Sequence, residues 1–481
     1  MEHLEQLNRL SGIERIEVKQ FLSEKRNRPD FDNKWMKLFF FIFREGLFIT
    51  LRKAFAHRLP QRNYLTVLKA TIDGNSYLNI SVQFQTNPEE FVLKNEFIPY
   101  FEINYREIEK KTDEYLPCFN QFTDESDYEK LGGKSVDKIS LGVMENPVKV
   151  RYHNGLFVYG LGGYVQMFIM HHFKKIRKIA CVDLNAELAK QFEKKFHFTT
   201  HFLLPHHSYN ALKQVEDPYV IIATYHSSHA SIAREVYEAN PNATIFIEKP
   251  PAVTLDDLQK LITLFNRGAK LEFGFNRRFI GYSNYVRKQV DGKVLVVTCS
   301  VKEVLINPNH WYFWKNQGTR VTGNAVHWFD LANYWIRSKP VEINVMAPPE
   351  DKESPLISVC YENGSVLNIT ASDKGNSLRG VQEKIEIRYE NETIFINDFT
   401  SLIHIKKNGT IKRKFRFIRS KGHDAMYKNF KKIIMQNRQS EYTLFDLICT
   451  SVVTYYASEM LKNGIRSQSI KQIITQYIKS I

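Results

Sequence analysis

A glycine-rich turn between two short apolar runs constrains this chain of 481 residues more than any other feature. Leu156 to Tyr159 has the continuous apolar character of a fully buried strand, and it leads directly into Gly160-Leu161-Gly162-Gly163. Apolar side chains then recur at helical spacing from Tyr164 to Phe173, and a second apolar run, Ile179 to Val182, ends in Asp183. This order predicts a strand–helix–strand unit with parallel strands.

The same unit has the order that a dinucleotide needs. Glycines let backbone N–H groups approach a pyrophosphate, and the N-terminus of the following helix favours its negative charge. Asp183, 21 residues after Gly162, could accept both ribose hydroxyls, and Asn185 could add a hydrogen bond. A carboxylate repels a 2′-phosphate, so we predict NAD rather than NADP. An ordinary crossover with a tight turn is the alternative, but it does not explain the position of Asp183.

Composition narrows the class of protein. A length of 481 residues predicts two or three domains. The net charge of +15 favours an anionic partner such as a nucleotide, an acidic sugar or a membrane surface. A solvated lysine-rich surface explains this charge equally well. We expect no nucleic-acid binding, because no arginine-rich tract or zinc-finger spacing occurs. The five cysteines form no CxxC pair, which indicates a reducing cytoplasm, and no signal peptide is expected.

Residues 1–145 are predicted to form an accessory region ahead of the dinucleotide unit. Residues 1 to about 60 have a basic, helical character, and Trp35 to Phe43 is aromatic. We favour a helix packed on a neighbouring domain over an interfacial helix at an anionic membrane. A β-hairpin is predicted around Asp73-Gly74, and residues 110–138 read as a loop or linker.

From Ala186 to Phe279 apolar strands alternate with amphipathic helices, which predicts a doubly wound parallel sheet over residues 146–278. Thr254 and Asp257 are predicted to cap one of these helices. Beyond about residue 290 the apolar residues alternate with period two, so residues 279–481 are predicted to form an α+β domain whose sheet buries one face. The fold class is therefore α/β followed by α+β, with C-terminal helices returning to the first sheet.

Six motifs in this order carry a resemblance to a known family: GLGGY with Asp183, ATYHSSH at 223–229, EKP at 248–250, GFNRRF at 274–279, GTRVTGNAVHWFDL at 318–331, and GHDAMYKNF at 422–430. From about Gly155 to Gly464 the chain resembles the Gfo/Idh/MocA family of oxidoreductases. The resemblance implies a Rossmann domain, an open-faced antiparallel sheet domain, NAD or NADP as cofactor and a polyol or sugar substrate. We also expect a homo-oligomer formed through the antiparallel sheet.

The predicted cofactor-binding residues follow strands of the parallel sheet, and they are Gly160, Leu161, Gly162, Gly163, Tyr164, Asp183, Asn185, Thr224, Tyr225, His226, His229, Glu248, Lys249 and Arg278. We interpret His226 and His229 as lining near the nicotinamide, since their spacing without a nearby carboxylate is weak evidence for a metal. No metal site is predicted. The pairs His171-His172 and His206-His207 are interpreted as surface features.

Lys249 and His327 are the predicted catalytic residues. An ammonium at a strand's carboxyl end can hydrogen-bond the reacting oxygen, and an imidazole can accept a proton near neutral pH; the resemblance implies the same roles. Asp330 lies three residues after His327 and could orient it. Asn324 and Asp330 are the predicted substrate-binding residues, and Asn324 could hydrogen-bond a hydroxyl. The alternatives are a surface lysine and a core histidine.

These residues predict a cytoplasmic NAD(P)-dependent dehydrogenase acting on a sugar, polyol or nucleotide-sugar, with a role in surface-glycan metabolism. Many members of the family carry Asp four residues before this histidine, whereas this chain has Gly323. The alternative function is therefore a cofactor-binding regulatory or scaffold protein that has lost turnover.

Overall fold

The computed structural model describes residues 152–183, 186–202, 204–304, 306, 317–348, 351, 354–375 and 380–479, with residues 42, 46, 47 and 49–51 and five strands nearer the N-terminus. The chain divides into two compact units. One consists of Met1–Lys34, Lys53–Val150 and Leu184–Glu187, and the other of Trp35–Arg52, Arg151–Asp183 and Leu188–Ile481. Trp35–Arg52 thus groups with the second unit, although the sequence placed it in the N-terminal accessory region.

The first unit contains a five-stranded antiparallel sheet in the order β4-β3-β2-β1-β5. Its strands are β1 (Leu10–Lys19), β2 (Tyr64–Ile72), β3 (Asn75–Gln83), β4 (Ile98–Pro99) and β5 (Lys134–Ile139). The predicted hairpin is confirmed, since Ile72 pairs with Asn75 across Asp73-Gly74. The prediction of helix was wrong for β1, where β-branched residues and pairing along β2 favour a strand. β5 likewise occupies part of the predicted linker.

The aromatic stretch from Trp35 to Phe43 lies outside the described residues except for Ile42, so the choice between a packed and an interfacial helix stays open. Within the part of the chain that the structure describes, no helix has the length and apolarity needed to cross a membrane.

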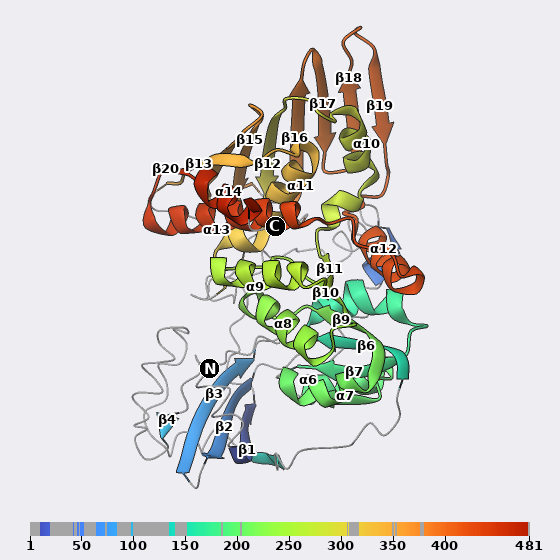
Figure 1. The fold of residues 1–481 in the computed structure, drawn as a ribbon, viewed down its shortest axis with the longest axis vertical. Coiled ribbons are helices and arrows are strands. Elements are labelled where there is room, and N and C mark those ends of the chain that lie inside the picture. Colours follow the sequence, from blue (N-terminus) through green and yellow to red (C-terminus); the bar gives the residue numbers. More distant parts are fainter. Residues whose placement is uncertain are drawn as a thin grey trace, which may run out of the picture. The chain divides into compact units, whose positions relative to one another are not determined.

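The second unit contains a six-stranded sheet in the order β11-β10-β9-β6-β7-β8, with every pair parallel (Figure 1). Its strands are β6 (Tyr152–Tyr159), β7 (Lys178–Val182), β8 (Thr200–Phe202), β9 (Val215–Ile222), β10 (Thr244–Ile247) and β11 (Lys270–Phe273). Phe157, Val158, Ile221 and Phe246 are fully buried, as expected for strands covered on both faces. The predicted doubly wound sheet is confirmed.

Helices α6 (Ala186–Phe196), α7 (Tyr209–Lys213), α8 (His229–Ala239) and α9 (Leu255–Asn266) connect these strands. The predicted cap of α9 is present, since Thr254 and Asp257 form a reciprocal capping box. The segment after the glycine turn is less regular than predicted: a π-helix, η3 (Val165–Ile169), runs into a 3-10 helix, η4 (Met170–Phe173). Val165, Ile169 and Met170 are all buried, and a wider turn places positions i, i+4 and i+5 on one side.

The second unit also holds a nine-stranded sheet in the order β19-β18-β17-β16-β12-β15-β14-β13-β20, antiparallel except for the β12–β15 pair. Its strands are β12 (Val296–Lys302), β13 (Pro340–Met346), β14 (Leu356–Tyr361), β15 (Val366–Ser372), β16 (Gln382–Tyr389), β17 (Glu392–Asn397), β18 (Ser401–Ile405), β19 (Ile411–Phe415) and β20 (Ser467–Ser469). Burial alternates along β16 as predicted for a sheet with one covered face. The sequence did not predict β18, β19 or β20, and the side chains of β19 are nearly all exposed.

Further helices of this unit follow β11 along the chain. They are η7 (Asn276–Phe279), α10 (Gly281–Gln289), the π-helix η9 (Val321–Ala325), α11 (Val326–Ile336), α12 (His423–Gln436), α13 (Leu444–Asn463) and α14 (Lys471–Lys479). α13 packs against α9, α11 and β13, and α12 packs against η4 and η7. Helices from the end of the chain therefore contact the elements around the glycine turn.

A buried ion-pair network fixes this junction. Arg278 on η7 donates from Nε and Nη2 to both carboxylate oxygens of Asp330 on α11, at 2.8 and 2.7 Å, and Nη2 also lies 3.1 Å from Asp446 on α13. Arg278 is 8% exposed and Asp330 is fully buried. The guanidinium carbon lies 4.3 Å above the ring of Tyr442. One arginine thus binds three elements that are distant in sequence.

We expect Asp330→Asn to lower the free energy of unfolding by about 3 kcal/mol, because it leaves a buried guanidinium only partly paired. Asp291→Asn is the matched control: its carboxylate lies 2.7 Å from Arg287 but at an exposed site, so stability should hardly change. Urea denaturation of both variants measures the difference. Equal stability of the two variants would show that the Arg278 network does not hold the junction.

Candidate active site

The glycine turn brings the ends of three strands together. Gly160 has φ +82°, and a Cβ added there would lie 2.3 Å from the carbonyl oxygen of Ala223, so only glycine allows β6 to turn beside the end of β9. The backbone N–H of Leu161 donates to Oδ2 of Asp183 at 2.8 Å. That bond fixes the carboxylate at the end of β7 against the turn.

The turn has room for a phosphate group. A Cβ added to Gly162 would meet nothing within 4 Å, and one added to Gly163 would meet only the side-chain end of Met167 at 3.8 Å. Open space beside a turn of backbone N–H groups, with an anchored carboxylate one strand away, fits a dinucleotide. Asn185, the other predicted ribose contact, lies outside the described residues.

The loop after β9 is held in place by its histidines. The His229 ring bridges two loops, with Nδ1 2.8 Å from the carbonyl oxygen of Pro250 and Nε2 3.0 Å from that of Thr224. Nδ1 of His226 lies 3.3 Å from the carbonyl oxygen of Gln317. Burial lowers the pKa of His229. Both rings therefore position the loop that carries Thr224 and Tyr225, where the sequence predicted cofactor contacts.

Glu248 and Lys249 follow β10 and point to different partners. Glu248 is buried and accepts a hydrogen bond from the hydroxyl of Tyr427 on α12, which also lies 3.0 Å from the hydroxyl of Tyr164. Burial raises the pKa of Glu248 to about 7. Lys249 Nζ donates to the carbonyl oxygen of Gly323 at 2.7 Å. Lys249 thus reaches η9, directly before the helix that carries His327.

His327 lies in the first turn of α11, and its Nδ1 is buried with no hydrogen-bond partner among the described residues. Its ring makes edge contacts with Phe275 and Trp328, with centroids 6.4 and 6.3 Å apart. Burial, together with the positive charges of Arg277 and Lys249, lowers the pKa of His327 well below its usual range. A neutral imidazole with an unsatisfied nitrogen differs from the satisfied core histidine that was the alternative.

The hydrogen bonds of Asp330 and Arg278 contradict their predicted roles. Asp330 does not orient His327, because both of its carboxylate oxygens accept from Arg278. For the same reason the donors of Arg278 are engaged in the junction rather than at the glycine turn. Helical spacing places Asp330 near His327, but the buried guanidinium of Arg278 forms stronger, charge-assisted hydrogen bonds with the carboxylate. Asn324, predicted to bind substrate, donates from Nδ2 to Glu303 at 2.8 Å.

Sequence reasoning assigned no role to a basic cluster beside His327. Arg277 donates from Nε and Nη2 to Glu383 at 2.8 and 2.9 Å, and Lys421 Nζ lies 3.7 Å from the same carboxylate. Burial lowers the pKa of Lys421 to about 7. Asn276 connects the cluster to α12, with Nδ2 3.2 Å from Nε2 of His423. The motifs GFNRRF and GHDAMYKNF contain or adjoin these residues, but only the fold unites them.

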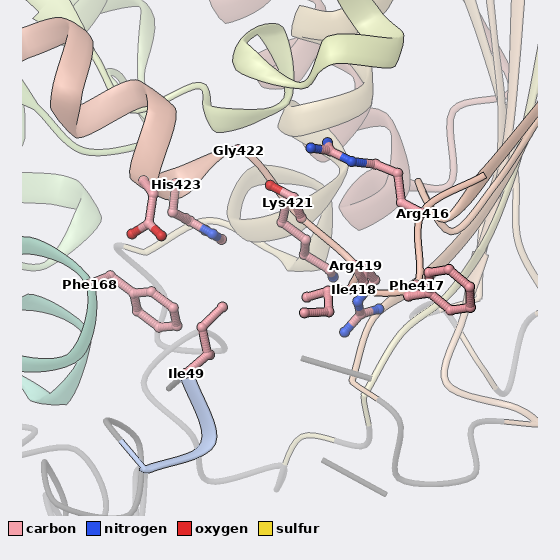
Figure 2. Close-up of a pocket in the computed structure, with 11 residues that line it drawn as sticks. Ile49, Phe168, Arg416, Phe417, Ile418, Arg419, Lys421, Gly422 and His423 are labelled. Carbon is pink, nitrogen blue, oxygen red and sulfur yellow. The ribbon is translucent and has the colours of Figure 1, made fainter. Parts of the chain in front are cut away.

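A pocket of about 520 Å³ shares Lys421 and His423 with this cluster (Figure 2). Its lining residues are Ile49, Phe168, Arg416, Phe417, Ile418, Arg419, Ser420, Lys421, Gly422, His423 and Asp424. The His423 ring packs on Phe168 with centroids 4.9 Å apart. The lining combines aromatic surface with cationic side chains, which suits an anionic ligand carrying a ring.

Residues 155–273 match the model of an oxidoreductase family with an NAD-binding Rossmann fold, the Gfo/Idh/MocA family. Over these residues the chain is similar to that family. Inositol 2-dehydrogenase of Rhizobium meliloti (strain 1021) is 28% identical over 180 residues, which cover 35% of this chain and 53% of that enzyme. The match therefore spans about half the length of this relative.

Solved structures extend the likeness to about two thirds of this chain. An oxidoreductase domain protein from Kribbella flavida has a TM-score of 0.56 at 16% identity, covering 67% of this chain and 99% of its own. Aldose–aldose oxidoreductase from Caulobacter crescentus, solved with glycerol, has a TM-score of 0.55 at 17% identity and coverages of 66% and 100%. GenD2 from gentamicin A biosynthesis, solved with NAD, has a TM-score of 0.54 at 15% identity and coverages of 66% and 96%. These likenesses establish the fold.

Substitution of Gly160 and of Gly162 should have different effects, one on stability and the other on cofactor binding. Gly162→Ala should leave the free energy of unfolding nearly unchanged, because its Cβ would meet no protein atom, but should weaken dinucleotide binding about 10-fold by intruding on the phosphate space. Gly160→Ala should instead destabilise the fold by about 1–3 kcal/mol through its clash with Ala223. NADH titration and thermal unfolding separate the two effects. Unaltered NADH affinity in Gly162→Ala would place the phosphates elsewhere.

Proposed function

We propose that this protein is an NAD-dependent dehydrogenase that oxidises a secondary alcohol of a sugar, polyol or nucleotide-sugar. The observation that carries the proposal is the convergence of Lys249, bound to the carbonyl oxygen of Gly323, and His327, four residues further along the same segment. Gly160 to Tyr164 and Asp183 would hold the dinucleotide. When bound, its nicotinamide supplies the hydride acceptor.

His327 and Lys249 would have different roles in the reaction. Oxidation of an alcohol releases a hydroxyl proton, and His327 can accept it because its lowered pKa keeps the imidazole neutral. Lys249 can donate a hydrogen bond to the reacting oxygen and so stabilise its developing negative charge. The carbonyl oxygen of Gly323 holds the ammonium close to α11. Base and hydrogen-bond donor are thereby supplied without Asp330.

We further propose an acidic substrate, one that carries a carboxylate or a phosphate. Support comes from Arg277, Lys421 and His423 beside His327, and from the aromatic and cationic lining of the adjoining pocket. The net charge of +15 agrees with an anionic ligand. A place in surface-glycan metabolism, in the cytoplasm, stays a prediction.

The alternative is a regulatory or scaffold protein that binds the cofactor without turnover. Gly323 favours it, because many members of the family resembled carry Asp at this position. Against it stands the hydrogen bond by which the backbone of Gly323 positions Lys249. Redox change of the cofactor upon addition of acidic sugars to the purified protein decides between the two functions.

Assembly through the nine-stranded sheet also stays a proposal. Phe395, Ile405 and Ile411, on the adjacent strands β17, β18 and β19, are 40%, 38% and 49% exposed, and Ile405 pairs directly with Ile411. Neighbouring apolar side chains of this size are typical of a surface that a second copy covers. Peripheral membrane contact by the N-terminal region is a separate possibility that rests on its sequence alone.

We expect NADH to bind more tightly than NADPH. Asp183 is anchored by the N–H of Leu161, and a fixed carboxylate accepts ribose hydroxyls but repels a 2′-phosphate. Fluorescence titration with both reduced cofactors measures the preference. Asp183→Ser should reduce the preference by about 10-fold. Tighter binding of NADPH to the unaltered protein would contradict the prediction.

Lys249→Ala and His327→Ala should each lower kcat for alcohol oxidation by about 10²-fold or more, while His327→Ala leaves NADH affinity nearly unchanged. In the unaltered enzyme the acid limb of kcat/KM should lie below pH 6.5, because the pKa of His327 is lowered. Lys249→Ala removes a neighbouring positive charge, so any residual activity should show this limb at higher pH.

His153→Ala is a matched control, since this histidine is exposed and pairs with Glu216 at the surface. It should retain full activity. Normal turnover in both Lys249→Ala and His327→Ala would exclude these residues from the proton transfer.

A further inference from the structure

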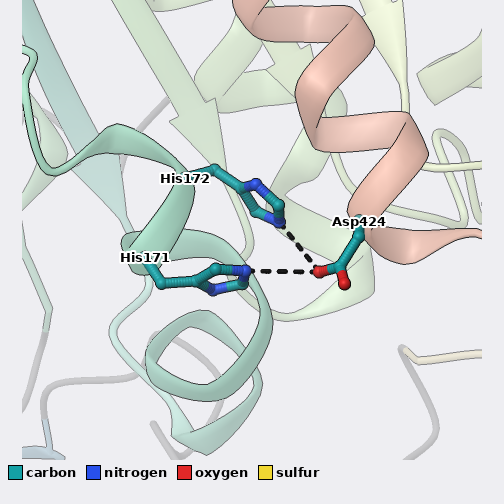
Figure 3. Close-up of side chains that lie close together, drawn as sticks. All are labelled: His171, His172 and Asp424. Carbon is teal, nitrogen blue, oxygen red and sulfur yellow. Dashed lines mark hydrogen bonds and ion pairs between the residues drawn. The ribbon is translucent and has the colours of Figure 1, made fainter. Parts of the chain in front are cut away.

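Two consecutive histidines and an aspartate from distant parts of the chain meet at one point (Figure 3). His171 and His172 lie on η4, directly after the π-helix of the glycine-turn segment, and Asp424 lies in the first turn of α12. Their Nε2 atoms lie 3.2 and 3.0 Å from the same atom, Oδ1 of Asp424. All three candidate ligand atoms lie within 4.8 Å of one another.

The convergence of neighbouring residues is unusual in itself. Successive side chains of a 3-10 helix point about 120° apart, since it has three residues per turn. Here both rings turn toward Asp424, with centroids 3.8 Å apart. The His172 side chain is 6% exposed, and its ring packs against Tyr427 at 5.7 Å. Packing therefore fixes at least one imidazole, so the arrangement does not depend on a mobile surface side chain.

Both distances to Oδ1 of Asp424 match those between ligands of one metal ion. With zinc–nitrogen and zinc–oxygen bonds of about 2.0–2.1 Å, ligand atoms at tetrahedral positions lie about 3.3–3.4 Å apart, and at octahedral positions about 2.9–3.0 Å apart. The observed 3.0 and 3.2 Å fall at this spacing. We propose that His171, His172 and Asp424 bind a divalent transition-metal ion, for which Zn²⁺ is the probe.

Both the ligand types and the exposure fit such an ion. Two imidazoles and one carboxylate form a donor set that suits zinc and its neighbours rather than Mg²⁺ or Ca²⁺. Asp424 is 46% exposed at its side chain and lines the pocket of about 520 Å³, so a coordination position can remain open to water or to a pocket ligand. The proposal revises the interpretation of His171-His172 as a surface feature and the prediction of no metal.

The ion would also tie η4 to α12. His172 packs against Tyr427, which binds Glu248 beside Lys249. A metal bound at this position would therefore stabilise the contact between η4, in the glycine-turn segment, and α12, which carries Tyr427. The proposal does not depend on the proposed dehydrogenase activity.

The test uses the full chain without a histidine tag, stripped with a chelator and titrated with ZnCl₂ by calorimetry at pH 7.5. Metal content after desalting gives the stoichiometry. We expect one Zn²⁺ per chain. In Asp424→Asn and His171→Gln the affinity for Zn²⁺ should be weaker by about 10-fold or more, because loss of a metal ligand should cost at least as much affinity as loss of a hydrogen bond that orients a metal ligand. His207→Gln is the matched control, because His206 and His207 also form a consecutive pair on a 3-10 helix. It should bind zinc like the unaltered chain.

No stoichiometric zinc, or equal affinity in all four proteins, would overturn the proposal. Circular dichroism without metal shows whether a variant has folded. A second measurement needs no variant: diethyl pyrocarbonate labelling of histidines in the unaltered chain, with and without zinc. Zinc should protect His171, whose side chain is 21% exposed, but not the exposed His207, and equal labelling of His171 with and without zinc would equally reject the site.

Discussion

A buried carboxyl group at the end of β10 holds the two halves of the candidate site together. Glu248 accepts from the hydroxyl of Tyr427, and Gly274 is required beside it, because a Cβ there would lie 2.6 Å from Oε2. Burial of a carboxylate is costly, and it raises the pKa of Glu248 to about 7 although the hydrogen bonds that the group accepts act to lower this pKa. The hydrogen bond between Tyr427 and Glu248 therefore joins α12 to the end of β10 in the parallel sheet.

Arg277 and Arg278 extend this junction in opposite directions. They are consecutive on a 3-10 helix, so their side chains diverge. Arg277 pairs with Glu383 on the nine-stranded sheet, whereas Arg278 pairs with Asp330 on α11 and Asp446 on α13. α11 is held between these pairs, which fixes the position of His327 at its start. The position of the proposed base thus depends on the ion pairs that Arg277 and Arg278 make.

The parts that sequence could predict are those whose signal is local. The glycine turn, Asp183 and the capping box of α9 each depend on residues close in the chain, and period-two alternation identified most of the second sheet. Strand β1 was predicted as helix because pairing with β2 cannot be read locally. Arg278 and Asp330 were placed at the cofactor and substrate because polar residues near motifs suggest binding. Their 52-residue separation hid the ion pair that engages them.

The first turn of α12 connects the candidate metal site to the candidate active site. His423 and Asp424 are adjacent, yet His423 faces Asn276 and Phe168 whereas Asp424 faces His171 and His172. A metal ion bound by Asp424 would restrict the motion of this turn. It would thereby also restrict the ring of His423, which lines the pocket. Because Asp424 also lines that pocket, a bound anion and a bound cation would attract each other across it. Occupancy of one site should therefore favour occupancy of the other, a coupling that follows from neighbouring positions on one helix.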